Sequence, residues 1–364
     1  QNLNGVSFAS QNTTIEATGG GNVAISALDQ GATLNARISL FNVTLTTASS
    51  GNVNLSSAGT LTTTDGSISA GGNMAVSAGP TTGDALTIVG TTLSTTTGRI
   101  DLRATSTTAR GMFIAGAVSG GSPAKIQSSS GDISILSAAG GTSWAIQLQR
   151  NVDITSSTGN ITIDSGARGL APAVVGTTNI GATASGTATG NVTILADRYW
   201  WGNDALDTVI KTSGHVIIES KADQFWGGQN AGSITLNRHV FSGNASVRIG
   251  KTNSSSDMEL TNGSINIVGD YNLHGKNIIH ATSATVSSGS IAISPNGTYT
   301  GAGNLTATLG SVSIRGGTSI APTGALQALG NITLSGSGNI TTTSGSSANI
   351  TSTSGSVAIT SVSY

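Results

Sequence analysis

A five-residue phrase recurs along the whole chain and limits what this sequence can fold into. It consists of a glycine, a small polar residue, and two aliphatic residues separated by one further small polar residue. Clear copies are Gly51–Leu55, Gly131–Ile135, Gly232–Leu236, Gly310–Ile314 and Gly330–Leu334. Repetition at this scale is typical of solenoids, in which each repeat stacks on its neighbours.

The spacing of the aliphatic pair predicts a half-buried strand. In Gly131–Ile135, the side chains of Ile133 and Ile135 leave one face of a strand and Ser134 leaves the other. One such pair cannot bury a core alone, but strands stacked about 4.8 Å apart place each aliphatic residue over the next copy. The sequence therefore predicts an all-β fold, a single-stranded parallel β-helix, right-handed by the usual preference of strand crossovers.

Copies of the phrase begin mostly about 18 to 33 residues apart, which sets the expected size of a coil. With roughly 20–25 residues per coil, we expect about 15–18 coils with loop insertions in one continuous β-helix over residues 1–364. The most regular coils are expected at 261–364, and the last phrase, Gly355–Val362, suggests a segment of a longer filament. The glycine or asparagine before each strand is expected to supply positive φ at a sharp turn.

Composition narrows the classes of function. Only 9% of residues are charged, the formal net charge is −1, and cysteine is absent. No basic field is available to recruit nucleic acid, and no apolar run is long enough to insert in a membrane. The absence of cysteine excludes disulfides and thiolate metal sites. We expect outer faces of Ser, Thr and Asn, which can form hydrogen-bonded ladders between coils.

Residues 196–241 interrupt the repeat and are expected to form an irregular, aromatic-rich insertion. Three of the four tryptophans lie there. Indole faces stack on sugars while carboxylates bond hydroxyls, so this stretch is a candidate glycan platform. The alternative is that its aromatic side chains pack against the coils. The candidate binding residues are Tyr199, Trp200, Trp201, Asp204 and Trp226.

Two further interruptions, 104–130 and 167–189, are expected to be loops or irregular coils without chemistry. Threonine runs such as Thr62–Thr64 and Thr95–Thr97 favour an ice-binding β-helix only if they recur at one position per coil. They do not recur in that way, so ice binding ranks third among the functional hypotheses.

Several carboxylates in the aromatic stretch raise the question of catalysis. Glycoside cleavage needs two carboxyl groups about 5–10 Å apart, and the repeat specifies no such pair. We therefore expect no enzyme and no catalytic residues, and these carboxylates to be solvated. A polysaccharide lyase or glycoside hydrolase is the alternative. The carboxylates are Asp197, Asp204, Asp207, Glu219 and Asp223.

Cofactor and metal motifs are missing. The four histidines lack the paired spacing of metal ligands, and neither a calcium-binding nonapeptide nor a phosphate-binding loop occurs. We expect no metal and no cofactor. The histidines are His215, His239, His274 and His280.

The repeats, above all those from Gly263 to Ser363, resemble those of filamentous-haemagglutinin-type exoproteins. These are large bacterial adhesins exported by two-partner secretion. The resemblance implies a right-handed β-helical filament at the surface of Gram-negative bacteria, with roles in adhesion, biofilm formation or toxin delivery. The asparagine-proline motifs of the family's secretion domain are not found, since Ser294–Gly297 lies too late, so an internal segment is implied.

The function expected from this resemblance is that of an extracellular structural and adhesive segment. It would mediate surface attachment or biofilm contacts. The implied partners are a host or bacterial surface glycan or protein, and further copies of the chain joined end to end or laterally. The implied location is extracellular, at the bacterial cell surface or associated with the outer membrane.

Overall fold

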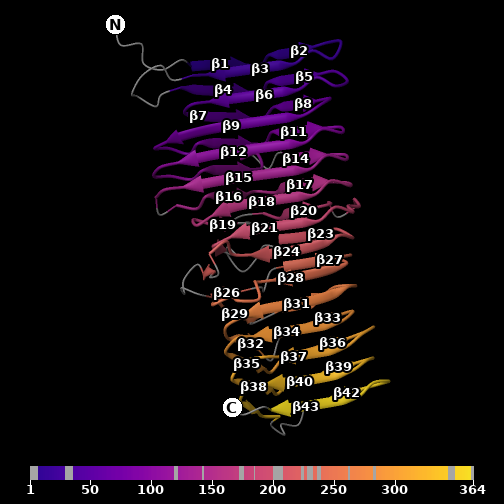
Figure 1. Ribbon diagram of the computed structural model, residues 1–364. Helices are drawn as coiled ribbons and strands as arrows, with labels where there is room; N and C mark the ends of the chain where they lie inside the picture. The colour runs from indigo at the N-terminus through magenta and orange to yellow at the C-terminus, as the bar shows by residue number, and fades with distance from the viewer. Residues whose placement is uncertain are drawn as a thin grey trace. The chain divides into compact units, whose positions relative to one another are not determined.

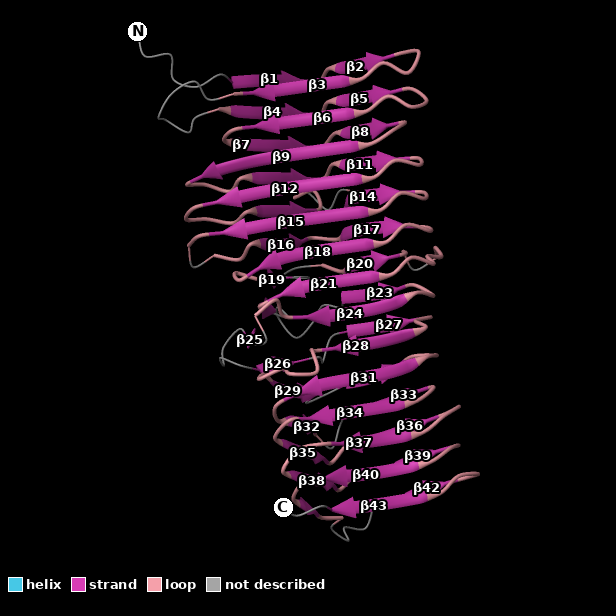
Figure 2. Ribbon diagram, in the orientation of Figure 1, coloured by secondary structure: helices cyan, strands magenta, loops and turns pink. Residues whose placement is uncertain are grey.

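The chain is described by a computed structural model that covers residues 7–28, 36–118, 122–141, 143–171, 176–183, 185–199, 208–222, 225–227, 233–235, 239–260, 263–281, 284–342 and 349–361. Within these ranges the fold is all-β, with parallel strands and no helix, as Figures 1 and 2 show. The predicted parallel β-helix is confirmed, and the coils wind in the right-handed sense (Figure 2). The chain divides into two compact units, residues 1–196 with 202–209 and residues 197–201 with 210–364.

Each coil of the first unit gives one strand to each of three sheets. The first sheet has the order β1 (Ser7–Gln11), β4 (Arg37–Phe41), β7 (Thr60–Thr64), β10 (Leu86–Val89), β13 (Met112–Ala115), β16 (Ile146–Gln149) and β19 (Leu170–Ala171). The second has β2 (Thr14–Ala17), β5 (Thr44–Thr47), β8 (Ser67–Ala70), β11 (Thr92–Thr95), β14 (Ala124–Ser128), β17 (Val152–Ser156) and β20 (Thr178–Gly181). The third has β3 (Val23–Ala27), β6 (Val53–Ser57), β9 (Met74–Thr81), β12 (Ile100–Ser106), β15 (Ile133–Ala139), β18 (Ile161–Gly166) and β21 (Val192–Ala196).

The second unit is built in the same way. Its longest sheet has β24 (His215–Glu219), β28 (Ser246–Ile249), β31 (Asp270–Gly275), β34 (Ile291–Pro295), β37 (Val312–Arg315), β40 (Ile332–Gly336) and β43 (Val357–Ser361). Another sheet has β26 (Ser233–Thr235), β29 (Asp257–Leu260), β32 (Ile278–His280), β35 (Thr298–Gly301), β38 (Ser319–Pro322) and β41 (Asn339–Ile340). A third sheet has β30 (Gly263–Asn266), β33 (Ala284–Ser288), β36 (Asn304–Ala307), β39 (Leu326–Ala328) and β42 (Ile350–Ser352). The remaining strands are β22 (Arg198–Tyr199), β23 (Thr208–Lys211), β25 (Trp226–Gly227) and β27 (His239–Ser242).

The described residues form fewer coils than the predicted 15–18. In the first unit the sheet that begins with β3 takes one strand from each coil and has seven strands, and in the second unit the sheet that ends with β43 also has seven. Some coils are longer than the predicted length of roughly 20–25 residues. Ile100, for example, pairs with Ile133, which lies 33 residues later. Tyr271, Ile291 and Val312 follow one another at shorter steps of 20 and 21 residues. The division between the units falls inside the stretch 196–241, and continuity of one β-helix through that stretch stays a prediction.

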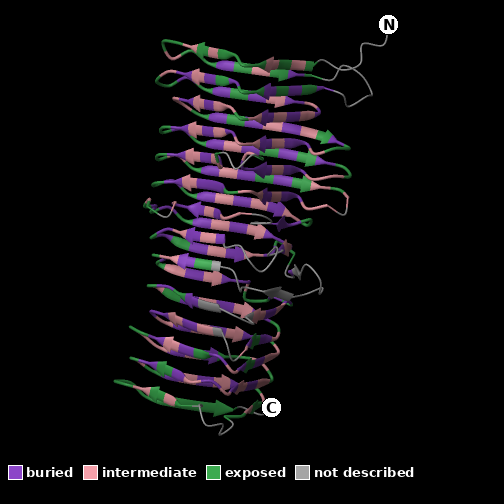
Figure 3. Cartoon of the chain, turned by 180° about the vertical axis from the view of Figure 1, so that it is seen from behind, coloured by how far each residue is buried: buried purple, intermediate pink, exposed green. Residues whose placement is uncertain are grey.

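Inward and outward positions alternate as the repeat predicts. Ile133 and Ile135 are each 1% exposed, whereas Ser134 between them lies on the outer face. Ile133 pairs with Ile100 on one side and Ile161 on the other, so aliphatic side chains form columns through the first unit. Figure 3 shows the alternation of buried and more exposed residues along the strands.

The glycines ahead of the strands have a different role from the one predicted. Gly131 and Gly159 do not have positive φ. A Cβ on Gly131 would lie 2.0 Å from the Gly98 carbonyl oxygen, and one on Gly159 would lie 2.1 Å from that of Gly131. Glycine is needed at this corner because successive coils approach too closely for any side chain.

The polar residue after each glycine links one coil to the next. The Asn22 side-chain oxygen accepts a hydrogen bond from the Asn52 backbone N–H at 2.8 Å, and Asn52 accepts from Asn73 at 2.7 Å. Asp132 and Asn160 repeat the pattern further along the unit. These bonds form the polar ladder expected from the composition, and each satisfies a backbone donor where the chain enters a strand.

Candidate functional site

The aromatic stretch does not present the predicted platform as a whole. Tyr199 lies in β22 and its side chain is 1% exposed, so it belongs to the core of the second unit and cannot stack on a sugar. This corrects its assignment as a binding residue, and for Tyr199 the packing alternative holds. In β25 the backbone of Trp226 pairs with Arg198. Trp200, Trp201 and Asp204 lie outside the described residues, as does the side chain of Trp226.

The described carboxylates of this stretch have structural partners. Asp197 is 6% exposed, and its Oδ1 accepts hydrogen bonds from the backbone N–H groups of Lys221 (2.6 Å) and Ala222 (2.7 Å). It therefore holds a turn and is not the solvated carboxylate that the sequence predicts. Glu219 pairs with Arg248 at 3.1 Å. Asp207 and Asp223 fall outside the described ranges.

The histidines occupy dissimilar environments. His215 is exposed, with its Nδ1 2.8 Å from the Ser246 hydroxyl. Burial, together with the charge of Arg248, lowers the pKa of His274. His280 is fully buried, which lowers its pKa to about 4. In the part of the chain that the structure describes, no three acidic or histidine side chains gather into a metal site.

The most elaborate side-chain cluster of the first unit lies at a coil corner that sequence patterns did not single out. Asp84, Arg110 and Trp144 each stand two residues ahead of a strand, namely β10, β13 and β16. Those strands stack in register, with Leu86 opposite Met112 and Met112 opposite Ile146. Residues far apart in the sequence thus occupy the same corner of three consecutive coils.

Arg110 is held in one orientation by its neighbours. Its Nε and Nη2 donate to the two carboxylate oxygens of Asp84 at 3.0 and 2.5 Å. Its Nη1 donates to Oε1 of Gln147 at 2.6 Å, and its guanidinium carbon lies 4.2 Å from the centre of the Phe113 ring. A bidentate ion pair with a cation–π contact fixes the guanidinium plane far better than a single surface pair does.

A hollow of about 390 Å³, the Arg110 hollow, opens over this cluster, and all of its lining side chains are partly exposed. Trp144 supplies an apolar ring beside polar groups, which is the combination that suits a sugar. Arg110 and Phe113 belong to the interruption 104–130, to which the sequence assigned no chemistry. The lining residues are Asp84, Arg110, Ser143, Trp144 and Gln147.

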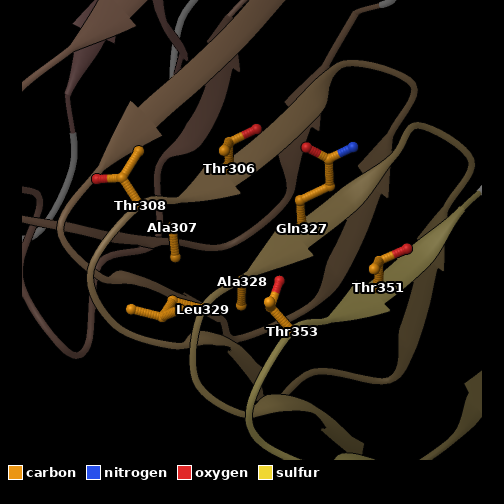
Figure 4. A pocket seen from close by; sticks show the side chains of 8 residues that line it. All are labelled: Thr306, Ala307, Thr308, Gln327, Ala328, Leu329, Thr351 and Thr353. Carbon is orange, nitrogen blue, oxygen red and sulfur yellow. The ribbon is translucent and has the colours of Figure 1, made fainter.

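A second hollow of about 390 Å³ lies in the second unit, on β36, β39 and β42 (Figure 4). Thr306, Gln327 and Thr351 occupy register positions one coil apart and form one side of it. Its lining carries no charge and one exposed aliphatic residue, Leu329. The other lining residues are Ala307, Thr308, Ala328 and Thr353.

Comparison of the chain with protein-family models, curated proteins and solved structures gave no match. Within the described ranges, no helix is long and apolar enough to cross a membrane.

Proposed function

We propose that this chain is a structural and adhesive segment of an extracellular filament at a bacterial surface, whose coil faces bind a surface glycan or protein. The Arg110 hollow is the observation that carries this proposal. It places a half-buried indole beside a fixed guanidinium, an amide and a hydroxyl, all on the side of a stacked coil. Such a site can hold a sugar without any moving part.

The scaffold supports the same role. Every strand pair whose register is known is parallel, and each strand inside a sheet lies between equivalent strands of the neighbouring coils. Hydrogen bonds and columns of aliphatic side chains run along the stack, so the side faces are presented on a stiff support. The surface is polar but sparsely charged, which favours neutral contacts and a few placed groups over a broad electrostatic field.

Adhesion suits the Arg110 hollow better than catalysis does. Asp84 is the single carboxylate of its lining, and both of its oxygens accept hydrogen bonds from Arg110. Acid–base cleavage of a glycosidic bond requires a second carboxyl group, which this lining does not contain. A polysaccharide-processing enzyme stays the alternative, with carboxylates from outside the described ranges.

A panel of soluble polysaccharides tests the proposal. The full chain, immobilised, should retain at least one polymer without shortening it, as measured by the size distribution of the recovered polymer. Cleavage that Asp204→Asn abolishes, in a variant that still folds, would establish the enzyme instead.

The Trp144→Ala variant locates the contact. We expect it to weaken polymer binding by roughly 1–3 kcal/mol, the usual range for an aromatic contact residue. The matched control is Phe41→Ala, which removes an aromatic ring that is 44% exposed on β4 of the same sheet. Titration calorimetry on both variants gives the comparison, and equal losses would place the contact elsewhere.

A further inference from the structure

The groups that the Arg110 hollow offers a ligand are mainly hydrogen-bond donors. A guanidinium has five N–H groups, and three of those of Arg110 are engaged by Asp84 and Gln147. The other two, one on each terminal nitrogen, have no partner among the described residues. Gln147 accepts through Oε1, so its NH2 group is a further donor of this lining, as is the Ser143 hydroxyl.

The charge of this corner favours an anion. Asp84 cancels the charge of Arg110 through the ion pair. Arg168 stands two residues ahead of β19, whose Leu170 pairs with Ile146, and therefore occupies the corner position one coil beyond Trp144. Its guanidinium is exposed and donates to the Gly140 carbonyl at 3.1 Å, which holds it against the loop that leads to Trp144. The four residues at this corner, Asp84, Arg110, Trp144 and Arg168, therefore have a net charge of +1.

We propose that the Arg110 hollow selects a sugar that carries a carboxylate. The inference rests on the proposed adhesive function and names its ligand class. The sugar ring lies against Trp144, and its carboxylate accepts hydrogen bonds from the uncommitted N–H groups of Arg110 and the amide of Gln147. A carboxylate binds these donors more strongly than a hydroxyl does, because an ionised acceptor gives shorter and stronger hydrogen bonds.

A neutral sugar fits the same lining less well. Its hydroxyls are both donors and acceptors, and the acceptors available to them are few. The Asp84 oxygens already accept from Arg110, and Oε1 of Gln147 does so too. Donors on the ligand would therefore compete with bonds that fix the site itself.

The test uses two forms of one polymer, polygalacturonate and its methyl ester, which differ in the charge of the carboxyl group. The full chain should bind polygalacturonate at least tenfold more tightly than the ester, as measured by calorimetry. Gln147→Glu should weaken polygalacturonate binding at least tenfold, because it replaces a donor by a second anion. The matched control, Gln127→Glu, makes the same change on the outer face of β14 in another sheet and should leave affinity within twofold.

Equal affinity for the two polymer forms would overturn the inference, and so would equal effects of the two glutamate variants. If either occurs while the chain still retains some polysaccharide, the adhesive function stands and only the acid preference falls. If the wild-type chain retains no polymer at all, the proposed function falls and the inference falls with it.

Discussion

The two units use the same repeat but place the aromatic side chains that the structure describes on opposite faces. Among the described residues of the first unit no aromatic ring is buried, and Phe41, Phe113 and Trp144 all lie at least partly on the surface. Among the described residues of the second unit, five aromatic side chains are buried: Tyr199, Phe225, Phe241, Tyr271 and Tyr299. Because side chains alternate along a strand, a shift by one position decides between these outcomes.

The consequences for chemistry are opposite as well. The first unit has an aliphatic core, and its cluster of charged and aromatic side chains, the Arg110 hollow, lies on the surface. The second unit carries polar aromatic groups inside: His280 Nδ1 lies 3.3 Å from the Tyr299 hydroxyl, with the rings edge to face. Gly301 makes room for this, since a Cβ there would lie 2.2 Å from that hydroxyl. The repeat determines the backbone of each coil. Single residues determine whether a polar or aromatic group lies on the surface or in the core.

The largest loss of stability is expected from a substitution in the aliphatic core of the first unit. Ile133→Asp would bury a carboxylate without a partner and should lower the free energy of unfolding by roughly 3–5 kcal/mol. Ser134→Asp, one residue further along the strand, should cost under about 1 kcal/mol because it stays on the outer face. Denaturant unfolding of both variants measures the difference, and equal losses would show that the alternation is wrong.

The next effect concerns the buried imidazole of the second unit. The folded pKa of His280 is about 4, below the 6.5 of an exposed imidazole, so the unfolded chain takes up a proton first as pH falls. The stability that comes from a neutral His280 is complete above pH 6.5. It should decline by about 3 kcal/mol between pH 6.5 and 4, since each pKa unit corresponds to about 1.4 kcal/mol.

Hydrogen exchange resolves which unit responds to acid. Protection in the strands around His280 should fall between pH 6.5 and 4 more in the wild type than in His280→Phe, after correction for intrinsic exchange. The variant is the control because it keeps a ring of similar size and lacks the titrating group. A pH dependence that the variant retains in full would assign the effect to other groups, such as His274.

The smallest effect compares the coil corners of the two units. Gly131→Ala should destabilise the chain by about 1–3 kcal/mol, because the new methyl meets a backbone oxygen that cannot move alone. Gly330→Ala should cost less, since its Cβ would first meet the Ser311 hydroxyl at 2.8 Å and the Gly310 oxygen only at 3.0 Å. Gly83→Ala is the control, with no atom within 4 Å. The melting temperatures of the three variants rank these costs. Equal decreases for Gly131→Ala and Gly330→Ala would show that the corners of the two units are packed equally tightly.

The sequence alone determined the strand repeat, its parallel stacking and the inward face of phrases such as Gly131–Ile135. It did so because period-two alternation and a recurring glycine are local signals that every coil repeats, as at Ile133 and Ile135. It also predicted ladders of small polar residues, which Asn22, Asn52 and Asn73 form.

Only the tertiary structure decided which residues meet between coils. Arg110 meets Asp84, 26 residues before it, and Gln147, 37 residues after it. Those distances depend on loop lengths, and loop length carries no periodic signal that a sequence pattern can read. For the same reason the described residues form fewer coils than the repeat predicts, and the sequence left open whether Tyr199 packs in the core or lies on the surface. The register that places each corner over the next is set by the packing of whole coils.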